Sequence, residues 1–109
     1  MRRRWSALVV VALLAAACSS SSALRTRERV ELDEGTLRAG MGEDDAVALL
    51  GPPDHRGQGA GGACRYAARF YDVRPDRETI ELSWRRPDRI IVAYLRGPIV
   101  TSVGVIPTP

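Results

Sequence analysis

The chain contains no lysine, one histidine and two cysteines among its 109 residues. A catalytic or metal site based on imidazole would therefore depend on His55 alone. No nucleophile stands at a suitable spacing from it, and no set of three or four ligands does either. The two cysteines, Cys18 and Cys64, are too few for the disulfide frameworks of small secreted domains. We expect no enzyme activity, no cofactor and no metal.

The first 17 residues have the pattern of a cleaved signal peptide. Arg2–Arg4 precede an apolar run, Trp5–Ala17, that is too short to span a bilayer comfortably. Small residues follow the run, where a stop-transfer segment would carry charges. The sequence predicts cleavage before Cys18, and the alternative is an ordinary secretory signal that is cut nearby.

The stretch Leu14-Ala15-Ala16-Ala17-Cys18 resembles the lipobox of bacterial lipoprotein precursors, with its leucine one place further from the cysteine than usual. The resemblance implies that the Cys18 thiol is acylated and becomes the first mature residue. Each buried methylene then contributes about 0.8 kcal/mol to membrane binding. Ser19 resembles the residue found in lipoproteins that pass to the outer membrane. We therefore expect a bacterial envelope protein, anchored to the outer membrane and facing the periplasm.

Removal of the signal peptide changes the charge of the protein. The full chain has a formal charge of +3, from 16 basic and 13 acidic residues. Arg2, Arg3 and Arg4 leave with the signal, so 13 arginines remain against 13 carboxylates. A mature chain without net charge gives no reason to expect a nucleic-acid partner.

The mature chain divides into a short spacer and one domain. Residues 18–30 are predicted to be the lipidated cysteine and a flexible spacer that begins with four serines. Residues 31–109 are predicted to form a single α+β domain. The charged stretch Arg25–Asp33 leaves two possibilities open: a frayed strand, or the approach to a short helical turn around Leu32–Ala39.

A helix is predicted directly after Gly42, which can serve as its N-cap. Acidic side chains in its first turn suit the helix dipole, and Gly51-Pro52-Pro53 ends it. The loop Asp54–Ala63 that follows contains Gly57-x-Gly59-x-x-Gly62, whose glycine spacing matches the fingerprint of dinucleotide-binding folds. Such a fingerprint needs a strand before it and a helix after it, whereas this order is reversed. We expect a flexible surface loop.

Hydrophobic alternation then predicts an antiparallel meander with one covered face. The expected strands are Cys64–Tyr71, Thr79–Arg85, Ile90–Leu95 and Ile99–Ile106, with Cys64 half-buried as a small apolar side chain or, alternatively, bonded to Cys18. In the second strand Ile80, Leu82 and Trp84 should point inward, and Thr79, Glu81, Ser83 and Arg85 outward. The expected fold is α+β, with a short helix pair on one face of a sheet of three to four antiparallel strands.

The motifs Leu37-x-x-Gly40-Met41-Gly42 and Leu49-Leu50-Gly51-Pro52-Pro53, followed by strands, resemble the SmpA/OmlA family of BamE-like envelope lipoproteins. Gly42 replaces the usual threonine, and Cys64-Arg65-Tyr66 replaces a tryptophan-led opening. The resemblance covers about residues 32–106. It implies a non-catalytic adaptor or stabiliser in outer-membrane protein assembly or envelope integrity.

Two partner classes follow from this interpretation: membrane lipid through acylated Cys18, and an envelope protein. We expect no small-molecule substrate. The alternative is a secreted or tethered inhibitor that binds a partner through aromatic side chains on its sheet. Exposure of Trp84 and Tyr94 would favour the inhibitor, and burial of both under helices would favour the adaptor.

Overall fold

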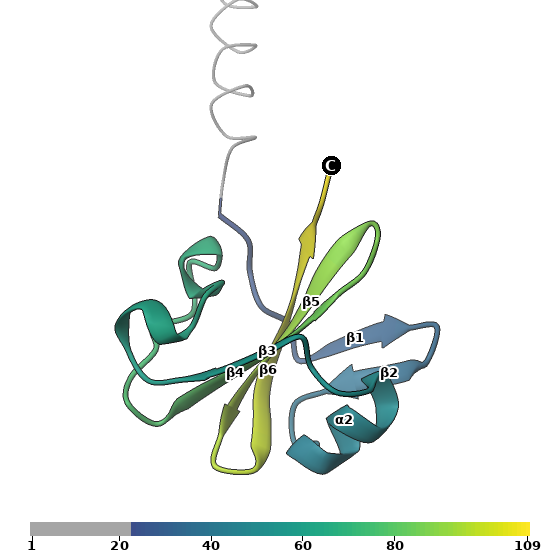
Figure 1. The fold of residues 1–109 in the computed structure, drawn as a ribbon, viewed down its shortest axis with the longest axis horizontal. Coiled ribbons are helices and arrows are strands. Elements are labelled where there is room, and N and C mark those ends of the chain that lie inside the picture. Colours follow the sequence, from purple (N-terminus) through teal and green to yellow (C-terminus); the bar gives the residue numbers. More distant parts are fainter. Residues whose placement is uncertain (1–22) are drawn as a thin grey trace, which may run out of the picture.

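Four antiparallel strands form the main sheet of the protein. The computed structural model describes residues 23–109. The sheet consists of β3 (His55–Gln58), β4 (Thr79–Arg85), β5 (Arg89–Arg96) and β6 (Ile99–Pro107), in that spatial order (Figure 1). Each strand runs antiparallel to its neighbour. The meander expected for the C-terminal half is confirmed, and β5, which is apolar on both faces, lies inside the sheet.

One face of this sheet, the hairpin-covered face, packs against a β-hairpin and a helix. The hairpin pairs β1 (Arg29–Leu32) with β2 (Gly35–Arg38), and the helix is α2 (Glu43–Leu50). These elements contribute Val30, Leu37, Ala46 and Leu50 to a core that contains the inward side chains predicted for β4. All three of these, Ile80, Leu82 and Trp84, are buried.

The opposite face, the loop-covered face, is also closed. Two short 3₁₀ turns, η1 (Gly61–Ala63) and η2 (Ala67–Arg69), lie over it. Cys64, Ala67 and Phe70 pack there against side chains of β5 and β6. The expectation of a single covered face is therefore wrong. Three β4 residues predicted to point to solvent, Thr79, Glu81 and Ser83, are buried.

The predicted helix pair is also wrong. Among residues 23–109 the structure has one α-helix, and the segment that could have formed a first helical turn is the β1–β2 hairpin. Val30 pairs with Leu37 and Leu32 with Gly35, so the apolar side chains share one face of the hairpin. Each of these strands has only four residues, so the alternation of apolar and polar side chains could not be recognised in the sequence among the charged residues around it.

Helix α2 lies where the sequence predicts it. Gly42 is its N-cap, Glu43, Asp44 and Asp45 occupy the first turn, and Gly51 at φ 85° ends it. The left-handed conformation at Gly51 favours glycine, and its backbone N–H donates to the carbonyl oxygen of Val47 at 2.8 Å.

The region between α2 and β4 differs from the prediction at two places. Residues His55–Gln58 form the edge strand β3, where a flexible loop was expected. The expected strand Cys64–Tyr71 is replaced by the turn region around η2. Cys64, Ala67 and Phe70 are buried at intervals of three, which is the repeat of a 3₁₀ helix. The same residues also suit an alternating pattern in part, and this caused the error.

Candidate functional site

The predicted lipidation site, Cys18, lies outside the described residues, and its acylation remains a prediction. Six positions later the chain joins the fold at Leu24, which bridges to Phe70. The packed part of the chain therefore starts before the predicted domain boundary at residue 31. Residues 24–27, which were assigned to the spacer, are attached to the domain, and we call them the N-terminal strap.

Backbone hydrogen bonds hold both ends of the N-terminal strap. Leu24 N–H donates to the Arg69 carbonyl at 2.9 Å, and Tyr71 N–H donates to the Leu24 carbonyl at 3.0 Å. At the other end, Arg27 and Val103 exchange two bonds of 2.7 and 2.9 Å. The strap thus joins the η2 region to the outer edge of β6. A force applied to the chain ahead of residue 24 would therefore act directly on the folded domain.

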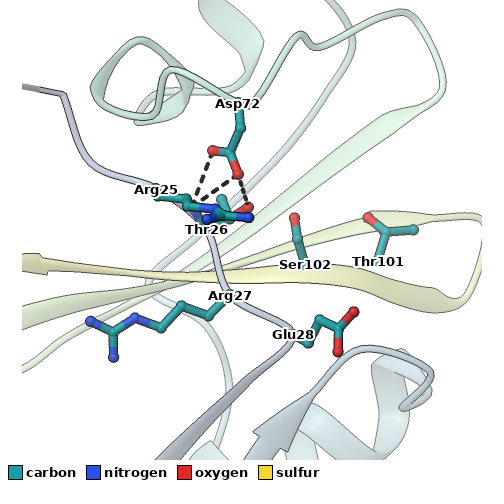
Figure 2. Close-up of a pocket in the computed structure, with 7 residues that line it drawn as sticks. All are labelled: Arg25, Thr26, Arg27, Glu28, Asp72, Thr101 and Ser102. Atoms are coloured by element: carbon teal, nitrogen blue, oxygen red, sulfur yellow. Dashed lines mark hydrogen bonds between the residues drawn. The ribbon is translucent and has the colours of Figure 1, made fainter.

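Asp72 provides the side-chain attachment of the strap (Figure 2). The hydroxyl of Thr26 donates to its carboxylate at 2.6 Å, and the Thr26 backbone N–H donates to both carboxylate oxygens at 3.1 and 3.2 Å. Partial burial alone would raise the pKa of Asp72. The hydrogen bonds from Thr26 outweigh that effect and lower the pKa below its ordinary value of 3.8.

A polar cleft of about 430 Å³ opens beside this attachment. Its lining combines charges of both signs with the hydroxyl groups of Thr101 and Ser102 on β6 (Figure 2). The Thr101 hydroxyl is already engaged, because it donates to the Tyr94 carbonyl at 3.1 Å. The remaining groups are mixed in charge, and they converge on no single point at which a reacting atom could sit.

The most unusual polar group lies beneath the loop-covered face. The Glu81 carboxylate is fully buried, and it accepts a hydrogen bond of 2.8 Å from the Tyr94 hydroxyl. The backbone N–H of Tyr66 donates to the same carboxylate at 3.1 and 3.3 Å. These bonds tie the turn region to the sheet, and they explain why a charged side chain is tolerated in the core.

Glu81 also controls the chemistry of its neighbours. Burial first, and then the hydrogen bond to Glu81, raise the pKa of Tyr94 far above its ordinary value. Burial also raises the pKa of the Cys64 thiol, with a further contribution from the negative charge of Glu81. A thiol with a raised pKa is a poor nucleophile, so this environment suits a structural cysteine.

The structure does not unite the residues considered for catalysis. Cys64 is buried, with its sulfur 3.4 Å from the Gly59 carbonyl oxygen, and it lies outside any strand. His55 lies in β3, where it pairs with Ser83 of β4, and no hydrogen bond between described residues joins it to Cys64. Within residues 23–109, no group of three histidine, cysteine or acidic side chains is placed to hold a metal ion.

Close packing accounts for one glycine of the fingerprint-like sequence. A Cβ atom at Gly57 would lie 1.8 Å from the carbonyl oxygen of Ala63, so η1 can approach β3 only over a glycine. Gly57 lies inside β3, and only a three-residue 3₁₀ turn follows, at Gly61–Ala63, whereas a dinucleotide fold needs an α-helix that opens at the glycines.

Sequence reasoning missed Glu81 and Asp72 because their roles depend on contacts across the fold. The alternating pattern of β4 assigns Glu81 to solvent, and only the position of η2 reverses that. Asp72 directly follows the expected strand Cys64–Tyr71 and lies 46 residues from Thr26 in sequence. No helix within the described residues is long and apolar enough to cross a membrane.

Comparison with known proteins finds no match: no protein-family model, no curated protein and no solved structure corresponds to this chain.

Proposed function

We propose that the protein is a lipid-anchored, non-catalytic lipoprotein of a bacterial envelope, held through Cys18. The observation that carries the proposal is the Leu14–Cys18 sequence, preceded by an arginine-rich start and an apolar run. The structure adds support, because the chain joins the domain at Leu24 through backbone bonds. A tether attached at Cys18 would therefore hold the folded domain close to the membrane.

The role proposed for the anchored domain is that of an adaptor or stabiliser for another envelope protein, in the manner of the BamE-like proteins that the Gly40–Pro53 motif resembles. In this chain the motif forms helix α2 with its N-cap and C-cap glycines. The inhibitor alternative needs aromatic side chains on an open sheet face. Trp84 and Tyr94 are 1% and 2% exposed, so that surface does not exist in the described fold, and we prefer the adaptor.

Metabolic acyl labelling tests the anchor. We expect the wild-type protein to incorporate a labelled fatty acid and Cys18→Ala to lose the label completely. Cys64→Ala, which removes the other cysteine of the chain, is the matched control and should keep the label. Label that persists in Cys18→Ala would refute the anchor.

Crosslinking in native envelopes tests the adaptor role. The lipidated protein should crosslink to one defined envelope protein, and recovery of outer-membrane assembly components would support the family resemblance. Recovery of an unrelated enzyme as the bound partner would contradict it.

A further inference from the structure

The two most exposed large apolar side chains of the described chain lie in different surroundings. Tyr71 is 60% exposed and follows Phe70, next to the N-terminal strap, whereas Ile99 is 44% exposed and begins β6. Figure 1 shows the start of the described chain and the C terminus at one end of the molecule, and the β5–β6 turn with α2 at the other. Ile99 therefore belongs to the end far from the tether.

Arg25, Arg69 and Tyr71 form what we call the tether-proximal surface. Leu24 and Phe70 form an isolated bridge and pack toward the core. The residues that adjoin them in the chain, Arg25, Arg69 and Tyr71, are all exposed.

The charge of this surface is available to a partner. Neither Arg25 nor Arg69 forms an ion pair with a carboxylate of the described chain. The neighbouring Asp72 carboxylate accepts its hydrogen bonds from Thr26, and the charge of Arg25 adds a smaller contribution to its lowered pKa. At the far end the acidic first turn of α2 lies beside Ile99 in a shallow cleft. Two arginines without an ion pair in the described chain therefore lie near its start, and the acidic first turn of α2 lies at the other end.

The length of chain between Cys18 and Leu24 limits how far the domain can stand from the membrane. Six residues span at most about 20 Å when fully extended. Acyl chains on Cys18 would therefore keep Leu24, together with the side chains around it, within that distance of the lipid head groups. Arginine binds phosphate through paired hydrogen bonds, and tyrosine and arginine are both favoured at membrane–water interfaces.

We propose that the tether-proximal surface is the membrane-contacting face of the domain, and that its partner is the phospholipid head-group layer of the anchoring bilayer. Arg25 and Arg69 bind lipid phosphates, and the Tyr71 ring lies at head-group level. This inference rests on the proposed function, because it takes Cys18 as the anchor. It gives the domain a fixed orientation, with α2 and the β5–β6 turn facing away from the membrane and accessible to a protein partner.

Hydroxyl-radical footprinting tests the orientation without relying on lipidation by the cell. Residues 18–109 carrying Cys64→Ala are coupled through Cys18 to a maleimide phospholipid, in protein-free vesicles of phosphatidylcholine and phosphatidylglycerol. The packed fold lies within residues 24–109, so this chain retains it. Compared with the uncoupled protein, oxidation of Tyr71 should fall several-fold on the vesicles, while oxidation of Ile99 stays unchanged.

A charge-reversal pair tests the role of the arginines. The double variant Arg25→Glu/Arg69→Glu should lose most of the Tyr71 protection. Arg38→Glu, which reverses an exposed arginine on the β1–β2 hairpin, should keep it. Equal protection of Tyr71 and Ile99, or none at Tyr71, would overturn the proposal. So would protection of Tyr71 in native envelopes but not on vesicles, because that result identifies a protein as the partner.

The two proposals can fail separately. Loss of the anchor would appear in the acyl-labelling experiment on cells, whereas the vesicle experiment supplies its own tether. A protein that is acylated at Cys18 but shows no difference between Tyr71 and Ile99 on vesicles would retain the proposed function and lose this surface.

Discussion

The two faces of the sheet are closed by different means. The hairpin-covered face is buried under regular elements, and its core is entirely apolar. The loop-covered face is buried under two 3₁₀ turns and includes the Glu81 carboxylate with its hydrogen bonds from Tyr94 and Tyr66. Apolar packing with one hydrogen bond from the Trp84 indole stabilises the first face, whereas the second face combines apolar packing with the hydrogen bonds of a buried carboxylate. The second face also receives the N-terminal strap, so the proposed tether at Cys18 would act on the more irregular half of the molecule.

Trp84→Ala should have the largest effect and tests the hairpin-covered face. The indole is 1% exposed, and its Nε1–H donates to the Gly51 carbonyl at 2.9 Å. Removal of a buried tryptophan leaves a cavity and should lower the free energy of unfolding by about 3–5 kcal/mol. Chemical denaturation measures this change. Ile99→Ala, at an exposed apolar site, is the control and should change stability little. Equal effects of the two substitutions would contradict the packing described for Trp84.

Gly104→Ala tests the close contact on the loop-covered face. A Cβ atom at this position would lie 2.3 Å from Cζ of Phe70, so the ring would have to leave its position on β6. We expect a loss of about 3 kcal/mol, at the upper end of the range for overpacked cores. Thermal unfolding checks this value. Gly62→Ala, where the added methyl group meets nothing within 4 Å, should be close to neutral. A neutral Gly104→Ala would show that Phe70 does not pack on β6.

Tyr94→Phe tests whether the buried carboxylate depends on its donors. The substitution keeps the ring, which packs edge-on against Phe70 at 6.0 Å, but removes the hydroxyl that Glu81 accepts from. Loss of a hydrogen bond to a charged group should lower the free energy of unfolding by about 1.5–3 kcal/mol. Tyr71→Phe, at an exposed position, is the matched control for urea denaturation. If both variants unfold at the same urea concentration, the Glu81 bond contributes nothing.

Asp72→Asn should have the smallest effect and a distinctive pH dependence. The folded state lowers the pKa of this carboxyl group, so its contribution is present above the unfolded value of 3.8 and is lost as pH falls through the lower folded value. The wild type should therefore melt above the variant at about pH 6, and the gap should close towards about pH 2. Asp44→Asn, on the exposed side of α2, is the control. A gap that does not change with pH would show that the Thr26 contact does not depend on charge.

The regular half of the fold could be predicted from sequence, and the reason is local. Strand β4 alternates in polarity over seven residues, β5 is a continuous apolar run, and α2 carries glycines at both ends and acidic residues in its first turn. Each of these signals lies within the element that it specifies. They are sufficient to place Trp84 in a core and β5 inside the sheet.

The loop-covered face could not be predicted, because its determinants are distant in sequence. Glu81 reads as a solvent-facing strand residue until Tyr66 and Tyr94 are known to surround it. Gly104 reads as a weak point in a strand until Phe70 is placed on it. The strap is attached through the contact between Thr26 and Asp72, which are distant in sequence. The sequence pattern therefore assigned residues 24–30 to the spacer. The candidate anchor at Cys18, in contrast, depends on a short local motif and was available from sequence alone.

Mass spectrometry of the mature N-terminal peptide, isolated from cell envelopes, tests the central claim most directly. The account predicts a chain that begins at Cys18 and carries covalently bound acyl groups on that residue. A mature chain that begins elsewhere, or begins at an unmodified Cys18, would contradict it.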